Sequence, residues 1–282
     1  MARKLTTMVV TRTEWITPHM IRVYLGGSGF ADFIAVDDTD SYIKIIFGRP
    51  GVGYPEPFDL ERIRSEFAPD DQPVVRTYTV RSVDTERGEI AVDFVVHGTS
   101  GIAGPWAASA QPGDVVRFNG PGSGYRPDPA APWHLMASDE AGLPALASAL
   151  EALPDTAIAK VFIEVAGPED ELALAAPSGA DITWIHRGAG SDEADDAVAG
   201  DNAPVIAAVR DAEWLDGEPQ VFIHGEAQAV MHNLRRYVRK ERGVSAKNAS
   251  ISGYWRRGRT EDGFRQWKAE LRKEEESAGS AL

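Results

Sequence analysis

The chain has no cysteine among its 282 residues. This lack excludes disulfides, thiolate nucleophiles, cysteine-ligated iron–sulfur clusters and cysteine zinc sites. Any redox chemistry must therefore come from a bound organic cofactor or from a metal held by histidine. The six histidines form no i, i+4 pair and no HExxH motif, so we expect no protein-bound metal.

An excess of basic residues and long apolar runs are also missing. Lys and Arg number 29 against 43 Asp and Glu, which gives a net charge of −14. A nucleic-acid binder needs a basic face, and anionic membranes also attract basic segments. No run approaches the roughly 18 apolar residues of a membrane helix, and the N-terminal MARKLTTMVV lacks a signal-peptide core. We expect a cytoplasmic protein with no nucleic-acid partner and no membrane insertion.

The first part of the chain is rich in short alternating apolar runs, separated by clusters of Gly, Pro and Asp. The runs cover residues 8–10, 21–25, 42–47, 77–80, 90–96 and 115–118. Short strands with turns between them predict a small closed or nearly closed β-barrel. We assign this first domain to residues 1–128.

The second domain, residues 129–282, alternates strand and helix patterns. Strands are predicted at 133–137, 160–165, 182–185 and 221–224, and helices at 143–153, 203–209 and 227–241. This alternation indicates a parallel sheet with helices on its faces. Residues 187–202 have almost no large apolar side chain, and we interpret them as a mobile loop and not as a site. A barrel followed by an α/β domain suggests a flavin reductase, although fold alone does not dictate function.

The sharpest local signal is the strand-like run Arg76-Thr77-Tyr78-Thr79. A flavin needs a cation for its pyrophosphate, a flat ring against its isoalloxazine and a short donor near its polar edge. Along a strand, Arg76 and Tyr78 point to one face and the two threonines to the other. Thr79 would therefore reach a flavin if the strand bends or ends there, or through its backbone amide. The alternative is an ordinary edge strand with Arg and Tyr at its surface.

A glycine-rich segment, residues 97–107, follows the apolar run 90–96. Gly98, Gly101 and Gly104 let backbone amides approach a diphosphate, and a helix beginning near Pro105 would add its positive end. The segment does not match GxGxxG, so a plain strand-to-helix turn stays open as the alternative.

The first turn of the α/β domain carries two acids, Asp139 and Glu140, where pyridine-nucleotide reductases carry glycines that hold phosphate. Carboxylates repel a diphosphate at close range. Either a nicotinamide nucleotide binds unconventionally or the electron donor is something else. Asp139 could also simply cap the following helix.

A basic and aromatic segment near the C-terminus is the exception to the acidic average. It comprises Lys247, Tyr254, Trp255, Arg256, Arg257 and Arg259. Such a set suits an anionic iron chelate or nucleotide phosphates, and Arg49 is a weaker candidate for the same partner. The alternative is a surface strand and helix start that balance local acids.

Taken together, these segments resemble the siderophore-interacting protein family, the FAD-binding ferric-siderophore reductases. The resemblance covers nearly the whole chain. It rests on RTYTVR (76–81), DFVVHG (93–98), GDVVRFNGPGSGY (113–125), SDEAGLPAL (138–146), HGEAQAVMHNLRRYV (224–238) and SGYWRRGRTEDGF (252–264), the last two being quite specific. It implies a ferredoxin-reductase-like fold, with an N-terminal Greek-key barrel that binds FAD noncovalently and a C-terminal, nucleotide-binding-like parallel-sheet domain.

The resemblance also implies roles for residues. Tyr78 and Thr79 match the flavin-binding strand and are the expected catalytic residues. Expected cofactor-binding residues are Arg76, Thr77, Tyr78, Thr79, Val95, His97, Gly98, Gly101, Ala103, Gly104, Trp106, Asp139 and Glu140, and expected substrate-binding residues are Lys247, Trp255, Arg256, Arg257 and Arg259. The chain departs from the family at Gly101-Ile102-Ala103, in place of Gly-Pro-Ala, and at Asp139-Glu140-Ala141, in place of Asp-Glu-Thr.

The function that the resemblance implies is reduction of ferric siderophores, with NADH, NADPH or ferredoxin as electron donor. Two alternatives stay open. One is a general flavin reductase that supplies electrons to a partner, and the other is a siderophore-binding protein without flavin.

Overall fold

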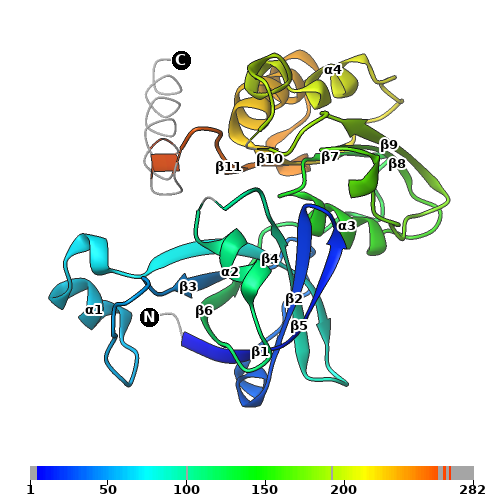
Figure 1. The fold of residues 1–282 in the computed structure, drawn as a ribbon. Coiled ribbons are helices and arrows are strands. Elements are labelled where there is room, and N and C mark those ends of the chain that lie inside the picture. The colour runs from blue at the N-terminus through cyan, green and yellow to red at the C-terminus, as the bar shows by residue number, and fades with distance from the viewer. Residues whose placement is uncertain (1–4, 100, 192, 260–262, 265–266, 268–282) are drawn as a thin grey trace, which may run out of the picture. The chain divides into compact units, whose positions relative to one another are not determined.

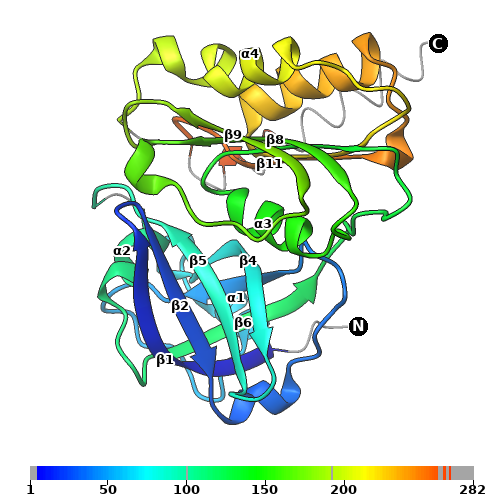
Figure 2. The same ribbon diagram turned by 90° about the vertical axis from the view of Figure 1, so that its right-hand side faces the viewer.

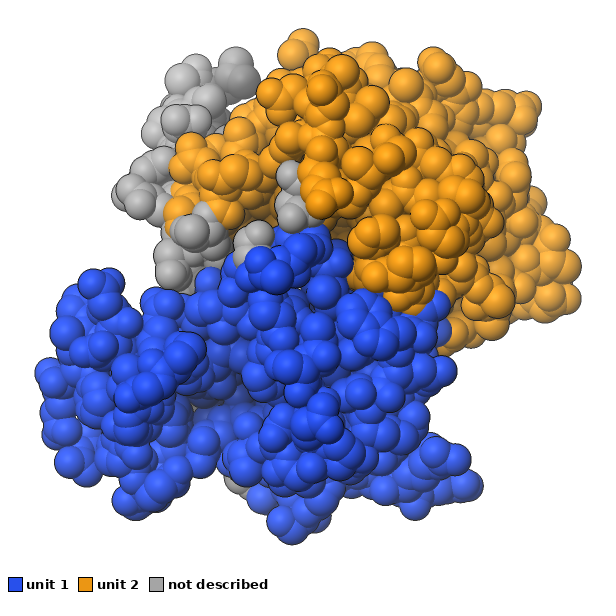
Figure 3. Space-filling view, viewed as in Figure 1, with its two compact units in different colours: residues 1–16, 20–124 blue, residues 17–19, 125–282 orange. Residues whose placement is uncertain are grey.

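The computed structural model describes residues 5–99, 101–191, 193–259, 263–264 and 267 (Figure 1). The chain divides into two compact units, drawn in different colours in Figure 3. Unit 1 holds residues 1–16 and 20–124, and unit 2 holds residues 17–19 and 125–282. No helix among the described residues is long and apolar enough to cross a membrane.

Unit 1 is a closed antiparallel barrel, as the alternating runs predict. Its strands are β1 (Leu5–Thr17), β2 (Met20–Gly26), β3 (Tyr42–Phe47), β4 (Val74–Asp84), β5 (Glu89–Val95) and β6 (Val115–Gly122). They follow the order β1-β2-β5-β4-β3-β6 around the barrel. The chain crosses from β2 to β3 and returns through β4 to pair β5 with β2, which is a Greek-key order.

Alternation along the strands builds the barrel core. In β2, Ile21, Val23 and Leu25 are almost fully buried, whereas Arg22 and Tyr24 between them are half-buried. Such a period of two sends every second side chain inward. The connecting elements are the short helices η1 (Ser28–Asp32), α1 (Leu60–Glu66), η2 (Pro69–Asp71) and α2 (Ala103–Ser109).

Unit 2 is built on a five-stranded parallel sheet (Figure 2). Its strands are β7 (His134–Ser138), β8 (Ile158–Val165), β9 (Gly179–His186), β10 (Gln220–Glu226) and β11 (Ala249–Trp255), in the order β11-β10-β7-β8-β9. Every residue of β7 is buried, as expected for a central parallel strand covered on both faces. The fold class expected from the sequence is therefore confirmed in both units.

Helices cover the two faces of this sheet. They are α3 (Leu143–Glu151), α4 (Pro204–Asp211), η6 (Gln228–Leu234) and η7 (Tyr237–Glu241), with short turns η3 (Pro168–Asp170), η4 (Asp196–Val198), η5 (Gly200–Asn202) and η8 (Ala246–Asn248). The predicted helix over 227–241 is confirmed in extent, but η6 and η7 are wound as π-helix. Figure 2 shows α3 on one face and α4 on the other.

This topology creates a switch point between β7 and β10, which are neighbours. After β7 the chain forms α3 and returns as β8, whereas after β10 it forms η6 and η7 and returns as β11 on the other side. In open α/β sheets, ligands bind at the carboxyl ends of the strands at such a point.

Candidate functional site

Strand β4 presents the predicted flavin-binding residues in unit 1. Arg76 and Tyr78 are half-buried, Thr77 is exposed and Thr79 is buried. The Tyr78 ring packs against Phe94 in the barrel core, with ring centroids 4.2 Å apart. One side of this ring is thus fixed by the core.

Strand β4 is irregular close to Thr79. The ladder between β4 and β5 shifts register between Val80 and Ser82, and β4 continues to Asp84. The Val80 amide donates to the Ser41 carbonyl at 2.7 Å. Thr79 itself pairs in register with Tyr42 of β3, so the irregularity begins after it, and a reach of Thr79 towards a flavin stays a prediction.

The glycine-rich segment joins β5 to α2. Gly98 (φ 51°) and Gly101 (φ 82°) adopt left-handed backbone, which residues with a side chain rarely adopt. Ala103 is buried, and the Trp106 ring lies 5.3 Å from the Phe47 ring. Ala103 and Trp106 thus anchor the segment, while Gly98 and Gly101 leave their backbone exposed. Ser100 of this motif lies outside the described residues.

Two further features fit this region to FAD. Gly104 packs against β5, because a Cβ added there would lie 3.3 Å from the Val95 carbonyl oxygen. No atom lies within 4 Å of a Cβ added at Gly101, so that backbone faces open space. A cation at Arg76, a flat ring at Tyr78 and a hydroxyl at Thr79 are the three kinds of group that a flavin nucleotide needs, and Gly98 and Gly101 add exposed backbone after β5. The individual roles of these residues, including Val95 and His97, stay predictions.

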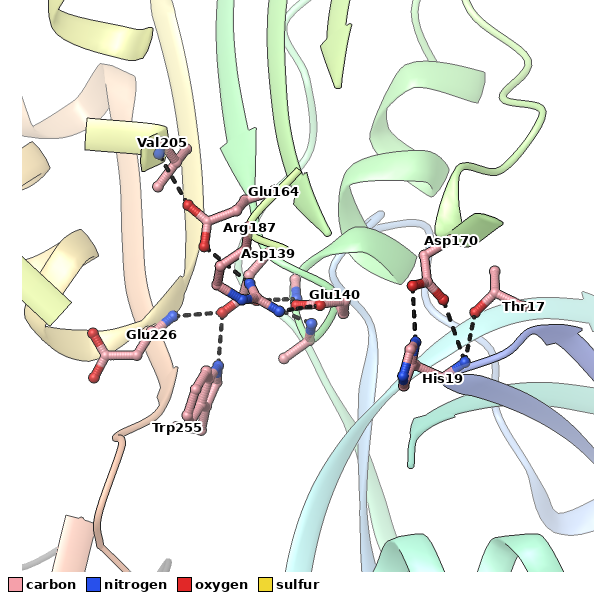
Figure 4. Close-up of polar contacts among 12 residues, drawn as sticks. Thr17, His19, Asp139, Glu140, Glu164, Asp170, Arg187, Val205, Glu226 and Trp255 are labelled. Atoms are coloured by element: carbon pink, nitrogen blue, oxygen red, sulfur yellow. Dashed lines mark hydrogen bonds and ion pairs between the residues drawn. The ribbon is translucent and has the colours of Figure 1, made fainter. Parts of the chain in front are cut away.

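In unit 2, Asp139 immediately follows β7, and its carboxylate is enclosed by donors (Figure 4). Oδ1 accepts from the Ala141 and Gly142 amides at 2.9 and 3.1 Å. Oδ2 accepts from the Glu226 amide at 2.8 Å and from the Trp255 indole Nε1 at 2.7 Å. Burial raises the pKa of Asp139, and these donated hydrogen bonds oppose the rise.

Glu140 and Glu164 share one guanidinium in the same cluster (Figure 4). Arg187 donates through Nη2 to Glu140 and through Nη1 to Glu164 Oε1 at 2.9 Å. The other oxygen of Glu164 accepts from the Val205 amide at 2.9 Å. Burial raises the pKa of Glu140 to about 7 against the attraction of Arg187, and burial also raises the pKa of Glu164.

The interpretation of residues 187–202 as a loop outside any site is wrong for part of this segment. Arg187 is only 7% exposed, and its ion pairs hold the segment against β7 and β8. Short turns η4 and η5 follow, and Ala194 and Gly200 line a cavity. The sequence carries only a weak signal for this contact: Glu164 lies near the end of a mostly apolar strand whose other charged residue is Lys160, and Arg187 directly follows the next strand.

The cavity lies at the carboxyl ends of β7, β8, β10 and β11, and its volume is about 490 Å³ including its open mouth. Asp139, Glu164 and Glu226 line it together with Arg187 and Arg257. Three carboxylates against two guanidinium groups make this lining acidic on balance, in contrast to the phosphate-binding turns of dinucleotide folds.

The predicted substrate-binding residues lie at two ends of β11. Lys247 is exposed in η8, before the strand, whereas Trp255, Arg256, Arg257 and Arg259 lie at its end or beyond it. A strand of this length separates them by roughly 20 Å. The structure therefore does not gather Lys247 with the others. Residues 260–262 of the motif lie outside the described residues.

The arginines after β11 already have partners within unit 2. Arg256 Nη1 donates to Gln228 Oε1, and its guanidinium lies 4.6 Å from the centre of the Trp267 ring. Arg257 Nη2 donates to the Ala194 carbonyl and pairs with Asp196 at 3.3 Å. Their binding of an anionic ligand stays a prediction.

Comparison with protein families places both units. Residues 9–125 match the siderophore-interacting FAD-binding domain, and residues 131–258 match the siderophore-interacting protein family. The chain belongs to the siderophore-interacting protein family. The resemblance read from its sequence motifs is therefore confirmed.

Several relatives match over most of their length. An uncharacterized protein of Mycobacterium tuberculosis is 55% identical, covering 95% of this chain and 96% of the relative. Ferric vibriobactin reductase ViuB of Vibrio cholerae is 31% identical, covering 90% of each chain. NADPH-dependent ferric-chelate reductase of Escherichia coli is 28% identical, covering 88% of this chain and 91% of the relative.

Solved structures agree on the fold. A siderophore utilization protein from T. fusca is 35% identical with a TM-score of 0.75, covering 91% of this chain and 94% of that one. The ferredoxin reductase in carbazole 1,9a-dioxygenase is 16% identical with a TM-score of 0.62, covering 90% and 70% of the two chains. The fold is thus ferredoxin-reductase-like.

Proposed function

We propose that this protein is an FAD-dependent oxidoreductase that reduces ferric siderophores in the cytoplasm and so releases Fe(II). The observation that carries the proposal is the set of residues on β4 and in segment 97–107, which fits a flavin nucleotide within a siderophore-interacting FAD-binding domain. The names of the Vibrio cholerae and Escherichia coli relatives, both ferric reductases, support the reaction class.

The residues of unit 1 would hold the cofactor in a defined way. Arg76 would pair with the pyrophosphate, Tyr78 would lie against the isoalloxazine, and Thr79 would donate to its polar edge. The amides around Gly98 and Gly101 would approach the diphosphate. When bound, FAD supplies the redox chemistry, accepting electrons in pairs and passing them on singly.

Iron release needs little from the protein beyond electron delivery. Siderophores hold the hard ferric ion through oxygen ligands, and the ferrous ion binds such ligands far less tightly. Reduction is therefore release, and no general acid or base is required. Trp255, Arg256, Arg257 and Arg259 are the residues that we expect to meet an anionic chelate.

The electron donor is a reduced nicotinamide nucleotide or ferredoxin. The name of the Escherichia coli relative favours NADPH.

The test is anaerobic reduction of the purified, FAD-loaded protein by NADH, NADPH or reduced ferredoxin, followed by stopped-flow oxidation with a panel of ferric chelates. The proposal expects faster oxidation by at least one ferric siderophore than by free ferric ion. Equal rates would favour a general flavin reductase. A colourless protein that takes up no FAD would refute the proposal and favour a siderophore-binding role.

A further inference from the structure

The turn between β7 and α3 has the construction of an anion site, yet the chain itself supplies the anion. In dinucleotide-binding α/β domains, the turn after the first strand presents backbone amides to a phosphate, and glycines allow the close approach. Here the Ala141 and Gly142 amides point in the same way to one group, which is the carboxylate of Asp139.

Two further strands, β10 and β11, contribute donors to the same carboxylate. The amide of Glu226, the last residue of β10, and the indole N–H of Trp255, the last residue of β11, both donate to Asp139 Oδ2. Four donors from three separate segments thus converge on one carboxylate. Such convergence on a negative group is typical of a binding site for a phosphate or a carboxylate.

Two glycines leave space around this turn, as glycines do around a bound phosphate. A Cβ added at Gly225 would lie 2.8 Å from Asp139 Cγ and about as close to both carboxylate oxygens. A Cβ added at Gly142 would lie 2.4 Å from the His224 carbonyl oxygen. Gly225 therefore gives its space to the carboxylate, and Gly142 allows α3 to begin against β10.

The acid that would hold a ribose in a dinucleotide-binding domain also has partners within this protein. In dinucleotide-binding domains, an acid after the second strand holds the ribose hydroxyls. Glu164 lies at the end of β8, the second strand of unit 2, but its Oε1 accepts from Arg187 and its Oε2 from the Val205 amide. Both oxygens thus serve the protein itself.

We infer that Asp139 is a built-in anion that occupies the phosphate position of unit 2 and closes it to the diphosphate of a nucleotide. Any phosphate entering this turn would meet the carboxylates of Asp139 and Glu140 and would find its amide donors already taken. A nicotinamide nucleotide that reduces this protein must therefore bind without hydrogen bonds from the amides of this turn to its phosphates. The inference concerns unit 2 alone and stands whether or not the reductase function proposed above is correct.

The test is rescue of stability by an external anion. Asp139→Gly deletes the atoms of acetate and leaves four donors facing a void, whereas Asp139→Asn deletes the charge but keeps the volume. Acetate and inorganic phosphate are each added to both variants and to the unmodified protein, with chloride at equal ionic strength as reference. The readout is the midpoint of thermal unfolding, which needs neither FAD nor a siderophore.

We expect both variants to unfold at lower temperature than the unmodified protein. Acetate and phosphate at about ten times their dissociation constants should raise the midpoint of Asp139→Gly by roughly 3 to 6 °C relative to chloride. For the Asn variant, and likewise for the unmodified protein, the unfolding midpoint should be the same in acetate, phosphate and chloride. A glycine variant that responds no more than the Asn variant overturns the inference.

A measurement on the unmodified protein covers the case in which neither variant folds. Hydrogen exchange of the amides of residues 138–143 is followed with and without saturating NADPH. Unchanged exchange there supports the inference, and added protection of these amides overturns it. Loss of reductase activity alters neither readout, so the two proposals fail separately.

Discussion

Replacement of Glu140 by Gln should make the protein more stable at alkaline pH. Folding raises the pKa of this carboxyl from 4.5 to about 7, because burial disfavours its charged form by more than the attraction of Arg187 favours it. A carboxyl whose pKa is raised by folding binds its proton more tightly in the folded state. The stabilisation of the folded state by this bound proton is complete below pH 4.5 and is lost as the pH rises through 7.

The size of this effect follows from the shift. Each pKa unit corresponds to about 1.4 kcal/mol, so Glu140 should remove roughly 3 kcal/mol from the free energy of unfolding between pH 4.5 and 8.5. The glutamine of the variant stays neutral across this range, and its amide oxygen can still accept from Arg187. The difference in stability between Glu140→Gln and the unmodified protein should therefore grow by roughly 3 kcal/mol over this range, in favour of the variant.

The assay is urea unfolding followed by tryptophan fluorescence at several pH values between 4.5 and 8.5. The difference between the two curves reports the titration of residue 140 together with its electrostatic coupling to Asp139, since groups away from this cluster titrate alike in both proteins. A constant difference across the range would refute the reasoning. Glu164→Gln is the contrasting variant. Both oxygens of Glu164 accept hydrogen bonds, so an amide NH₂ must face a donor, and stability should fall by about 1–3 kcal/mol at acidic pH. Because burial also raises the pKa of Glu164, this loss should become smaller as the pH rises.

Three further predictions test the two units. Arg76→Ala should lower the FAD retained after gel filtration, whereas Arg62→Ala, on the exposed face of α1, should not; equal flavin-to-protein absorbance ratios would count against the Arg76 assignment. Gly225→Ala should cost about 2 kcal/mol or more in urea unfolding, because its Cβ would lie 2.8 Å from a buried carboxylate, while Gly53→Ala, with open space around it, should be nearly neutral. Trp255→Phe should lower stability by about 1.5–3 kcal/mol by removing the indole N–H that donates to that carboxylate, and an unchanged midpoint would show that the bond contributes nothing.

The fold was largely predictable because each unit repeats one local pattern. Alternation places Ile21, Val23 and Leu25 inside the barrel, and the uninterrupted burial of β7 is what a parallel strand between two helical layers requires. The π-helical winding of 228–234 and 237–241 could not be foreseen, since the apolar spacing is that of an ordinary helix. Helix type there is decided by packing and not by local preference.

Candidate site residues could be proposed from the sequence only where they are consecutive. The run Arg76–Thr79 and segment 97–107 could be proposed because one strand and one turn carry all the groups, and their roles stay predictions. The cluster around Asp139 is assembled from β7, β8, β10 and β11, so neither Glu164 nor Arg187 has a neighbour in sequence that reveals its partner. Only tertiary structure brings Arg187 between two acids.

The arrangement around Asp139 bears directly on the choice of electron donor. A diphosphate held by backbone amides gains several charge-assisted hydrogen bonds, each worth roughly 1.5–3 kcal/mol. A carboxylate that permanently takes four of these donors removes this contribution from any nucleotide. If NADPH reduces the protein, its affinity must come from groups other than a diphosphate held in this turn, namely the nicotinamide, the riboses, the adenine or the 2′-phosphate. Inorganic pyrophosphate should therefore compete poorly with NADPH, and strong competition would show that a diphosphate site exists elsewhere on the chain.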